Sequence, residues 1–133
     1  MRPYRGLTKE GRWMKGWYVY DRLQDKHYIF DDEVKDDWKF EVIPETVGQF
    51  TGLCDKNDKE LDWWEGDIFN HRSGTYLIIY EEGGLYMQGP GGKCTVSEAA
   101  HWKESPVKIG NIHENPELWE QDNGDTRNNQ IPS

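Results

Sequence analysis

The chain has 133 residues, a net charge of −9 and an aromatic content of 14%. This length fits one domain that buries enough surface to fold without disulfides or a metal, and so many aromatic residues exclude a disordered chain. The longest apolar run, Tyr76 to Tyr80, is far too short to cross a bilayer, so we expect no contact with a membrane.

Cys54 and Cys94 have neither the spacing of a zinc site nor that of a CxxC motif. We also find no signal peptide. These features predict a reduced, cytoplasmic protein. A single bridge between the two cysteines stays open as the alternative.

Charge is unevenly distributed along the sequence. Residues 1–30 carry seven Lys and Arg against three Asp and Glu, and residues 31–67 carry four against thirteen. Segments of opposite sign can attract each other within one chain or between copies. Solvated surface is the simpler interpretation, because exposed ion pairs contribute little free energy.

The first fifty residues predict short strands. Residues 3–6 and 13–20 suggest an N-terminal hairpin around a polar turn, with a β-bulge at Gly16. Residues 31–39 are charged and predict a loop or edge, or one helical turn capped by Asp31 or Asp32. Further strands are expected at 27–30, 40–43 and 47–50.

A polar connection at 51–60 follows, with a tight turn at Asn57 and Asp58, since both side chains tolerate left-handed backbone. The apolar run at 75–80 is continuous rather than alternating, so both of its faces should be covered. A turn at 71–74 precedes it. Other strands are expected at 67–70, 85–87 and 107–112.

Two short helices are expected after these strands. Residues 95–102 could form one, capped by Thr95 or Ser97. The other would begin at Pro116 with Asn115 as its cap, and Leu118 and Trp119 would pack back on the sheet. From residue 121 the chain is polar, and we predict a disordered tail.

Many short strands between glycine-rich turns predict a mainly β fold, with α+β as the alternative. The architecture would be a small barrel or a folded sheet with an N-terminal hairpin. We expect one domain over residues 1–120, made of a hairpin part at 1–45 and a barrel core at 46–120, followed by the tail at 121–133.

The motifs that would indicate a metal-binding, phosphate-binding or catalytic site are incomplete. Asp55 and Asn57 begin like a calcium loop, but its later ligand positions are filled by unsuitable residues. Residues 89–94 resemble a phosphate loop without its first glycine and its Ser or Thr. The four histidines lack metal-ligand spacing, and no nucleophile motif is present. We therefore expect no metal, no cofactor and no enzymatic activity.

Two groups of residues have both a structural and a functional interpretation. Glu65 and Asp67 flank Gly66, and paired carboxylates can share a proton or hold a metal. A backbone corner explains the same three residues more simply. The adjacent Trp63 and Trp64 would point to opposite faces of an extended chain, so either one is exposed at an interface or both are buried.

Basic and aromatic residues are interleaved near the N-terminus, and such residues can contact phosphates and stack on bases. Nucleic-acid binding is therefore an alternative function. The net charge of −9 opposes it unless a basic face is segregated. The candidate contacts are Arg2, Arg5, Arg12, Lys15, Trp13 and Trp17.

Two blocks of sequence carry a family resemblance. The first runs from Gln49 to Leu53, continues through Asp55 to Asn57 and Glu60, and ends in Glu65 to Ile68. The second runs from Ile109 to Leu118. With the aromatic-rich opening from Met1 to Tyr20, these blocks resemble the YopX family over roughly residues 1–120.

The sequence departs from the family pattern at three places. Asp58 stands where the family usually has a glycine, Trp63 and Trp64 lengthen the link before Glu65, and Cys54 replaces a polar residue. These departures concern local loop geometry.

The resemblance implies a protein encoded by phages or prophages, with a core similar to SH3-like barrels and a capacity to self-associate in the bacterial host's cytoplasm. It brings no catalytic residues. We therefore predict a non-enzymatic accessory protein that binds further copies of itself and a host or phage protein. The family-motif residues, expected to be structural or to lie at an interface, are Gly52, Leu53, Asp55, Glu65, Gly66, Asp67, Gly110, Asn111, Asn115 and Pro116.

Overall fold

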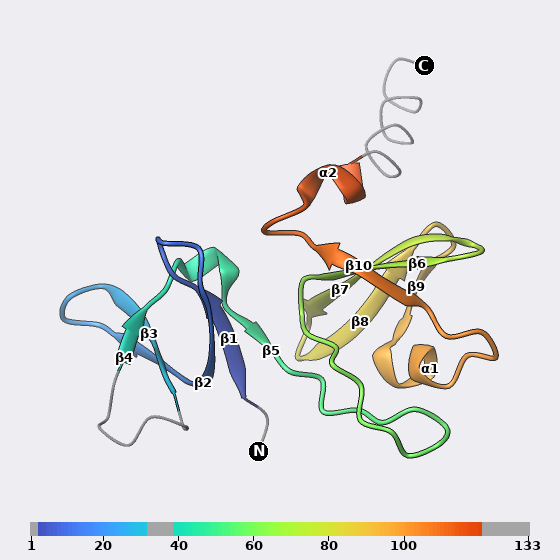
Figure 1. Ribbon diagram of the computed structural model, residues 1–133, viewed down its shortest axis with the longest axis horizontal. Helices are drawn as coiled ribbons and strands as arrows, with labels where there is room; N and C mark the ends of the chain where they lie inside the picture. The colour runs from blue at the N-terminus through green and yellow to red at the C-terminus, as the bar shows by residue number, and fades with distance from the viewer. Residues whose placement is uncertain (1–2, 32–38, 121–133) are drawn as a thin grey trace. The chain divides into compact units, whose positions relative to one another are not determined.

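The computed structural model describes residues 3–31 and 39–120. The chain forms two compact units, one up to Phe50 and one from Thr51 onward, and each unit contains one five-stranded antiparallel sheet (Figure 1). The prediction of a mainly β fold is confirmed. Neither sheet closes into a barrel, so of the two expected architectures the SH3-like barrel is not the one that the described residues form.

The sheet of the first unit has the strand order β4-β3-β2-β1-β5. The short 3-10 helix η1 (Pro44–Thr46) lies before β5 in the sequence. Because β5 pairs with β1, the chain up to Phe50 belongs to this unit, whereas the expected division placed residue 46 onward in the core. The strands are β1 (Tyr4–Leu7), β2 (Trp13–Asp21), β3 (Lys26–Phe30), β4 (Lys39–Glu41) and β5 (Gly48–Gln49).

One face of this sheet forms a small core. Met14, Ile29 and Val42 are buried there, with exposed fractions of 5%, 0% and 3%. Tyr18 and Phe40 are among the half-buried residues that pack against them. The large rings compensate for the small number of aliphatic residues, because each ring buries a large area.

Gly16 is needed for a close approach of two strands. It pairs with Tyr4 without a shift of register, so the predicted bulge is wrong. A Cβ at this position would lie 1.9 Å from the carbonyl oxygen of Phe30, far inside the closest approach that real Cβ atoms make. Any larger residue would therefore push β2 and β3 apart.

The sheet of the second unit is a meander of consecutive strands, and a later strand pairs with the first strand of that meander. Strands β6 (Asp67–His71), β7 (Gly74–Glu81), β8 (Gly84–Gly89) and β9 (Gly92–Thr95) follow one another, and β10 (Val107–Asn111) pairs with the outer side of β6. Helix α1 (Val96–Ala100) follows β9, and the one-turn α2 (Pro116–Trp119) follows β10. The prediction of Thr95 as a cap is confirmed, since its side chain accepts a hydrogen bond from the backbone N–H of Glu98 at 3.1 Å.

The core of the second unit lies between one face of its sheet and α1. Trp63 packs edge-on against Phe69 there, with ring centroids 5.0 Å apart. Of the two alternatives for the tryptophan pair the second is correct, because Trp63 and Trp64 are only 6% and 3% exposed. The remaining buried members are Ile78, Leu85, Met87, Val96, Ala99 and Ala100.

The strand at 75–80 is less completely covered than its composition predicts. Ile78 is 1% exposed on the core face, but Leu77 and Ile79 are only half-buried on the other face. Tyr80 is 57% exposed, so the expectation of two covered faces fails at this end of the strand.

Further sequence-based expectations concern other parts of the chain. The predicted loop or helical turn at 31–39 falls almost wholly outside the described residues, and so do the predicted tail at 121–133 and Arg2. Cys54 and Cys94 are both free thiols. Within residues 3–31 and 39–120, no helix has the length and apolar character needed to span a membrane.

Candidate functional site

Gly66 forms the corner from which β6 begins. Its backbone N–H donates to the carbonyl oxygen of Ile78 at 2.8 Å, and its own carbonyl accepts from the N–H of Ile112 at 2.8 Å. Its φ angle of 95° suits glycine, and a Cβ would lie 3.0 Å from Nε2 of His113. The backbone conformation and the close contact with His113 therefore explain why this position is a glycine.

Asp67 is a buried carboxylate whose hydrogen bond and ion pair hold parts of the second unit together. It is 1% exposed. One oxygen, Oδ2, accepts from the backbone N–H of Trp64 at 2.8 Å and lies 3.0 Å from Nζ of Lys108. The same ammonium group also lies 3.5 Å from Oδ2 of Asp62. A carboxylate with these partners anchors the link before β6 to β10.

Asn111 organises the turn after β10. Its side-chain oxygen accepts from the N–H groups of His113 and Glu114 at 3.0 and 2.9 Å, and its amide donates to the Glu114 carboxylate at 2.9 Å. Asn115 is the N-cap residue of α2, as predicted, but its side chain makes no cap hydrogen bond. Its oxygen accepts instead from the N–H of Asn111 at 3.3 Å. Pro116 is the first residue of α2, as predicted.

The pairing of β10 with β6 brings both sequence blocks together. Asp67 lies opposite Asn111, and Ile68 lies opposite Gly110 beyond a bulge. A Cβ on Gly110 would lie 2.5 Å from Oδ1 of Asn115, so this glycine lets the turn fold back on the strand. We call this arrangement the motif corner; it comprises Glu65, Gly66, Asp67, Gly110, Asn111, Asn115 and Pro116.

The rest of the first block forms a two-stranded arm. The N–H of Leu61 donates to the carbonyl of Leu53 at 2.9 Å, and Cys54 bridges to Glu60. The Asp55 carboxylate accepts from the N–H groups of Lys59 and Asn57, and these hydrogen bonds lower its pKa. The tight turn predicted here is confirmed by the positive φ of Asp58.

The comparison with known families decides the membership. The family model for the YopX protein matches residues 4–120, which include the motif corner, the arm and all five strands of the first unit. The chain belongs to the YopX family. No curated protein matches it.

In this YopX chain most of the basic and aromatic candidates of the N-terminus lie on one side of the first sheet, although Arg5 is only 7% exposed. Cross-strand pairing of Arg5 with Lys15, and of Leu7 with Trp13, places these side chains on the sheet face opposite the core. Trp17 follows on the same face. The guanidinium of Arg5 lies 4.5 Å from the centre of the Trp13 ring. Arg12 is exposed in the turn before β2.

The surface continues across β3 to β4. Trp17 pairs with Phe30 and Val19 pairs with Tyr28, and the ammonium of Lys39 lies 4.5 Å from the Tyr28 ring centre. Trp17 and Val19 are 45% and 43% exposed. We call this surface the aromatic face; it comprises Arg5, Trp13, Lys15, Trp17, Val19, Tyr28, Phe30 and Lys39.

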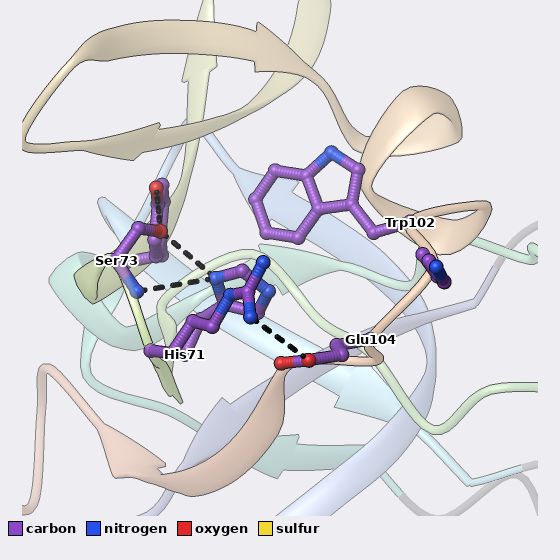
Figure 2. Close-up of a pocket in the computed structure, with 7 residues that line it drawn as sticks. His71, Ser73, Trp102 and Glu104 are labelled. Atoms are coloured by element: carbon purple, nitrogen blue, oxygen red, sulfur yellow. Dashed lines mark hydrogen bonds and ion pairs between the residues drawn. The ribbon is translucent and has the colours of Figure 1, made fainter.

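A hollow in the second unit brings together residues that the sequence analysis missed. It has a volume of about 320 Å³ and lies beside the turn from β6 to β7 (Figure 2). The sequence signalled only a turn at 71–74, and no spacing connected it to residue 102. We call this hollow the His71–Trp102 pocket; it is lined by His71, Arg72, Ser73, Tyr76, Trp102, Lys103 and Glu104.

Polar side chains line one side of this pocket in a continuous chain. Oγ of Ser73 lies 2.7 Å from the hydroxyl of Tyr76 and 2.8 Å from Nδ1 of His71. A second hollow, of about 210 Å³, shares Tyr76 and Trp102 and also contacts Cys94. Burial raises the pKa of the Cys94 thiol, with a smaller contribution from Glu98.

The described residues offer no evident metal centre. No group of three or more His, Cys, Asp or Glu in residues 3–31 and 39–120 is placed to hold a metal ion. The three groups of residues differ in what they can do. The motif corner stabilises the fold, whereas the aromatic face, through Lys15, Trp17 and Val19, and the His71–Trp102 pocket have side chains that are accessible to a partner or ligand.

Proposed function

We propose that this YopX chain is a phage- or prophage-encoded accessory protein without enzymatic activity. It acts in the host cytoplasm by binding proteins, and the first of these is a second copy of itself. The observation that carries the proposal is the aromatic face, where Trp17 and Val19 are 45% and 43% exposed. Each pairs across the strands with an aromatic residue, Phe30 or Tyr28. Tryptophan at the centre of an apolar patch is typical of residues that dominate protein interfaces.

The charges around this face favour contact with a second copy. Lys15 and Lys39 lie on it, and an ion pair between Lys26 and Glu41 (3.8 Å) lies at its edge. A twofold contact places the same patch on both partners, so a basic position of one copy can meet an acidic position of the other. A face that carries both signs is therefore suited to self-association.

Sedimentation velocity over a wide dilution series tests the self-association. The wild-type chain should dimerise, and Trp17→Glu should weaken the dimer by about tenfold or more, because it places a charge in the patch centre. Tyr80→Glu is the matched control, since Tyr80 is 57% exposed in the other unit. A wild-type chain that is monomeric throughout, or a Trp17→Glu variant that dimerises normally, contradicts the proposal.

The proposed binding of a host or phage protein requires a separate measurement. Affinity capture from a host lysate treated with nuclease should recover a stoichiometric protein with the wild-type chain and lose it with Trp17→Glu. Recovery of the bait alone would leave self-association as the whole function.

A second candidate function is nucleic-acid binding by the same face. Lys15 and Trp17 are exposed there, and an exposed cation beside an exposed ring is the combination that single-strand binding proteins use for phosphate contact and base stacking. The predicted contact Arg5 is only 7% exposed, so it does not add to this surface. The affinity for a single-stranded oligonucleotide should then fall steeply with salt, by about 0.7 in log K per log unit of salt for each phosphate contact. Fluorescence anisotropy with Lys15→Glu and Arg12→Glu measures this. Binding that salt leaves unchanged would refute it.

A further inference from the structure

The His71–Trp102 pocket has an aromatic wall. The Trp102 ring lies 4.9 Å from the His71 ring and 5.2 Å from the Tyr76 ring, measured between centroids. Figure 2 shows the indole beside the His71 ring, with Ser73 and Glu104 also among the residues that surround the hollow. Trp102 is only half-buried, so part of its ring is open to a ligand. A wall of this kind favours a flat, unsaturated ligand.

The polar side of the pocket presents hydrogen-bond donors. The backbone N–H of Ser73 donates to Nδ1 of His71 at 3.4 Å, which favours the tautomer with its proton on Nε2. In that tautomer Ser73 Oγ donates to Nδ1 and accepts from the Tyr76 hydroxyl. Within residues 3–31 and 39–120, Nε2 of His71 has no hydrogen-bond partner, which leaves it as a donor for a ligand.

Two cations stand at the rim. Arg72 forms an ion pair with Glu104 at 3.3 Å, but the two side chains are 78% and 55% exposed. Such an exposed pair is weak, so a ligand anion can take the place of Glu104 at little cost. Lys103 has no ion pair or hydrogen bond within the described part of the chain. The rim therefore favours an anionic group.

We propose that the His71–Trp102 pocket binds a nucleoside monophosphate. The base packs against Trp102, and the phosphate is held by Arg72 and Lys103 with Nε2–H of His71 as a further donor. The volume of about 320 Å³ suits one small ligand of this size. This site is independent of the aromatic face and of the function proposed for it.

The hydroxyl–imidazole pair serves binding rather than catalysis. A serine nucleophile needs a histidine that a third group orients, together with donors for an oxyanion. His71 has no carboxylate hydrogen-bonded to it in residues 3–31 and 39–120. Ser73 instead links Tyr76 to His71 and holds both rings in place.

Isothermal titration calorimetry with AMP, GMP, CMP and UMP tests the site. Adenosine and inorganic phosphate serve as probes for the two halves of the ligand, and a short 5′-phosphorylated oligonucleotide tests a strand end as the source of the same chemistry. At least one monophosphate should bind, and the double variant Arg72→Gln/Lys103→Gln should weaken it by about tenfold or more. The double variant Lys9→Gln/Arg22→Gln removes the same charges from the exposed surface of the other unit and should bind as the wild type does.

A second readout does not depend on these variants. The indole N–H resonance of Trp102, assigned from the spectrum of Trp102→Phe, should shift when AMP is added. No binding of any monophosphate, no shift at Trp102, or equal binding by Arg72→Gln/Lys103→Gln would overturn the proposal. So would equal affinity for inorganic phosphate, or a clear preference for the oligonucleotide.

Discussion

Asp67 is almost completely buried, and its carboxylate is shared between the Trp64 backbone and Lys108. Removing this carboxylate takes away the buried acceptor of the Trp64 N–H, which costs more than losing an exposed ion pair. Asp62 also contacts Lys108, but its side chain is 71% exposed. The two carboxylates therefore differ in what the fold needs from them.

Asp67→Ala should lower the free energy of unfolding by about 2–4 kcal/mol, because the Trp64 N–H loses a buried acceptor and Lys108 loses its buried partner while keeping its contact with the exposed Asp62. Asp62→Ala should cost about 1 kcal/mol, since it breaks an exposed contact and one hydrogen bond from the Trp64 indole. Urea denaturation of both variants measures the difference. Equal losses would show that the burial of Asp67 contributes nothing special.

At the scale of the elements, the sequence predicted what depends on neighbouring residues. The Thr95 cap, Pro116 at the start of α2 and the turn at Asp58 all follow from local hydrogen bonding and backbone preference. Each is decided within about four residues, so one sequence contains the whole cause.

What the sequence could not show depends on distant partners. Gly16 was predicted to form a β-bulge, but it is there because β3 comes close to it. The sequence could not distinguish these two reasons, because glycine suits both. The return of β10 to β6 is also non-local, and so is the contact of Trp102 with His71 across the second unit. The motif residues were identified, but their meeting at one corner and the whole His71–Trp102 pocket were not.

Gly16→Ala should destabilise the first unit by about 3 kcal/mol or more, because its Cβ would overlap the Phe30 carbonyl and force β2 away from β3. Gly11→Ala is the control, since Gly11 also has a positive φ but nothing lies within 4 Å of its Cβ position. It should cost only about 1 kcal/mol from backbone strain. Thermal unfolding of the two variants compares them, and similar midpoints would contradict the close approach.

At the scale of the whole molecule, the chain has two cores rather than one. Ile29 is fully buried in the first unit and Ile78 is 1% exposed in the second, and they belong to separate clusters. Composition alone could not show this division, because both units use the same short strands and the same aromatic residues.

Ile29→Ala and Ile78→Ala form a reciprocal pair of tests for this division. Each should cost about 2–5 kcal/mol in its own core. Hydrogen exchange should show loss of protection in β2 and β3 for Ile29→Ala, and in β7 and β8 for Ile78→Ala, because each unit opens as its own cooperative group. Equal loss of protection across both sheets in either variant would mean that the chain unfolds as one unit.

Strand β10, the last strand of the second sheet in the sequence, affects the order in which the two units fold during synthesis. A chain leaving the ribosome exposes its N-terminal part first, and units fold as their residues become available. The first unit ends at Phe50, so it can form early in synthesis. The second unit has to wait for Lys108 and Asn111, which reach Asp67 only when β10 has emerged. Until then Asp67 lacks its partner Lys108, and we expect the first unit to complete its sheet before the second does.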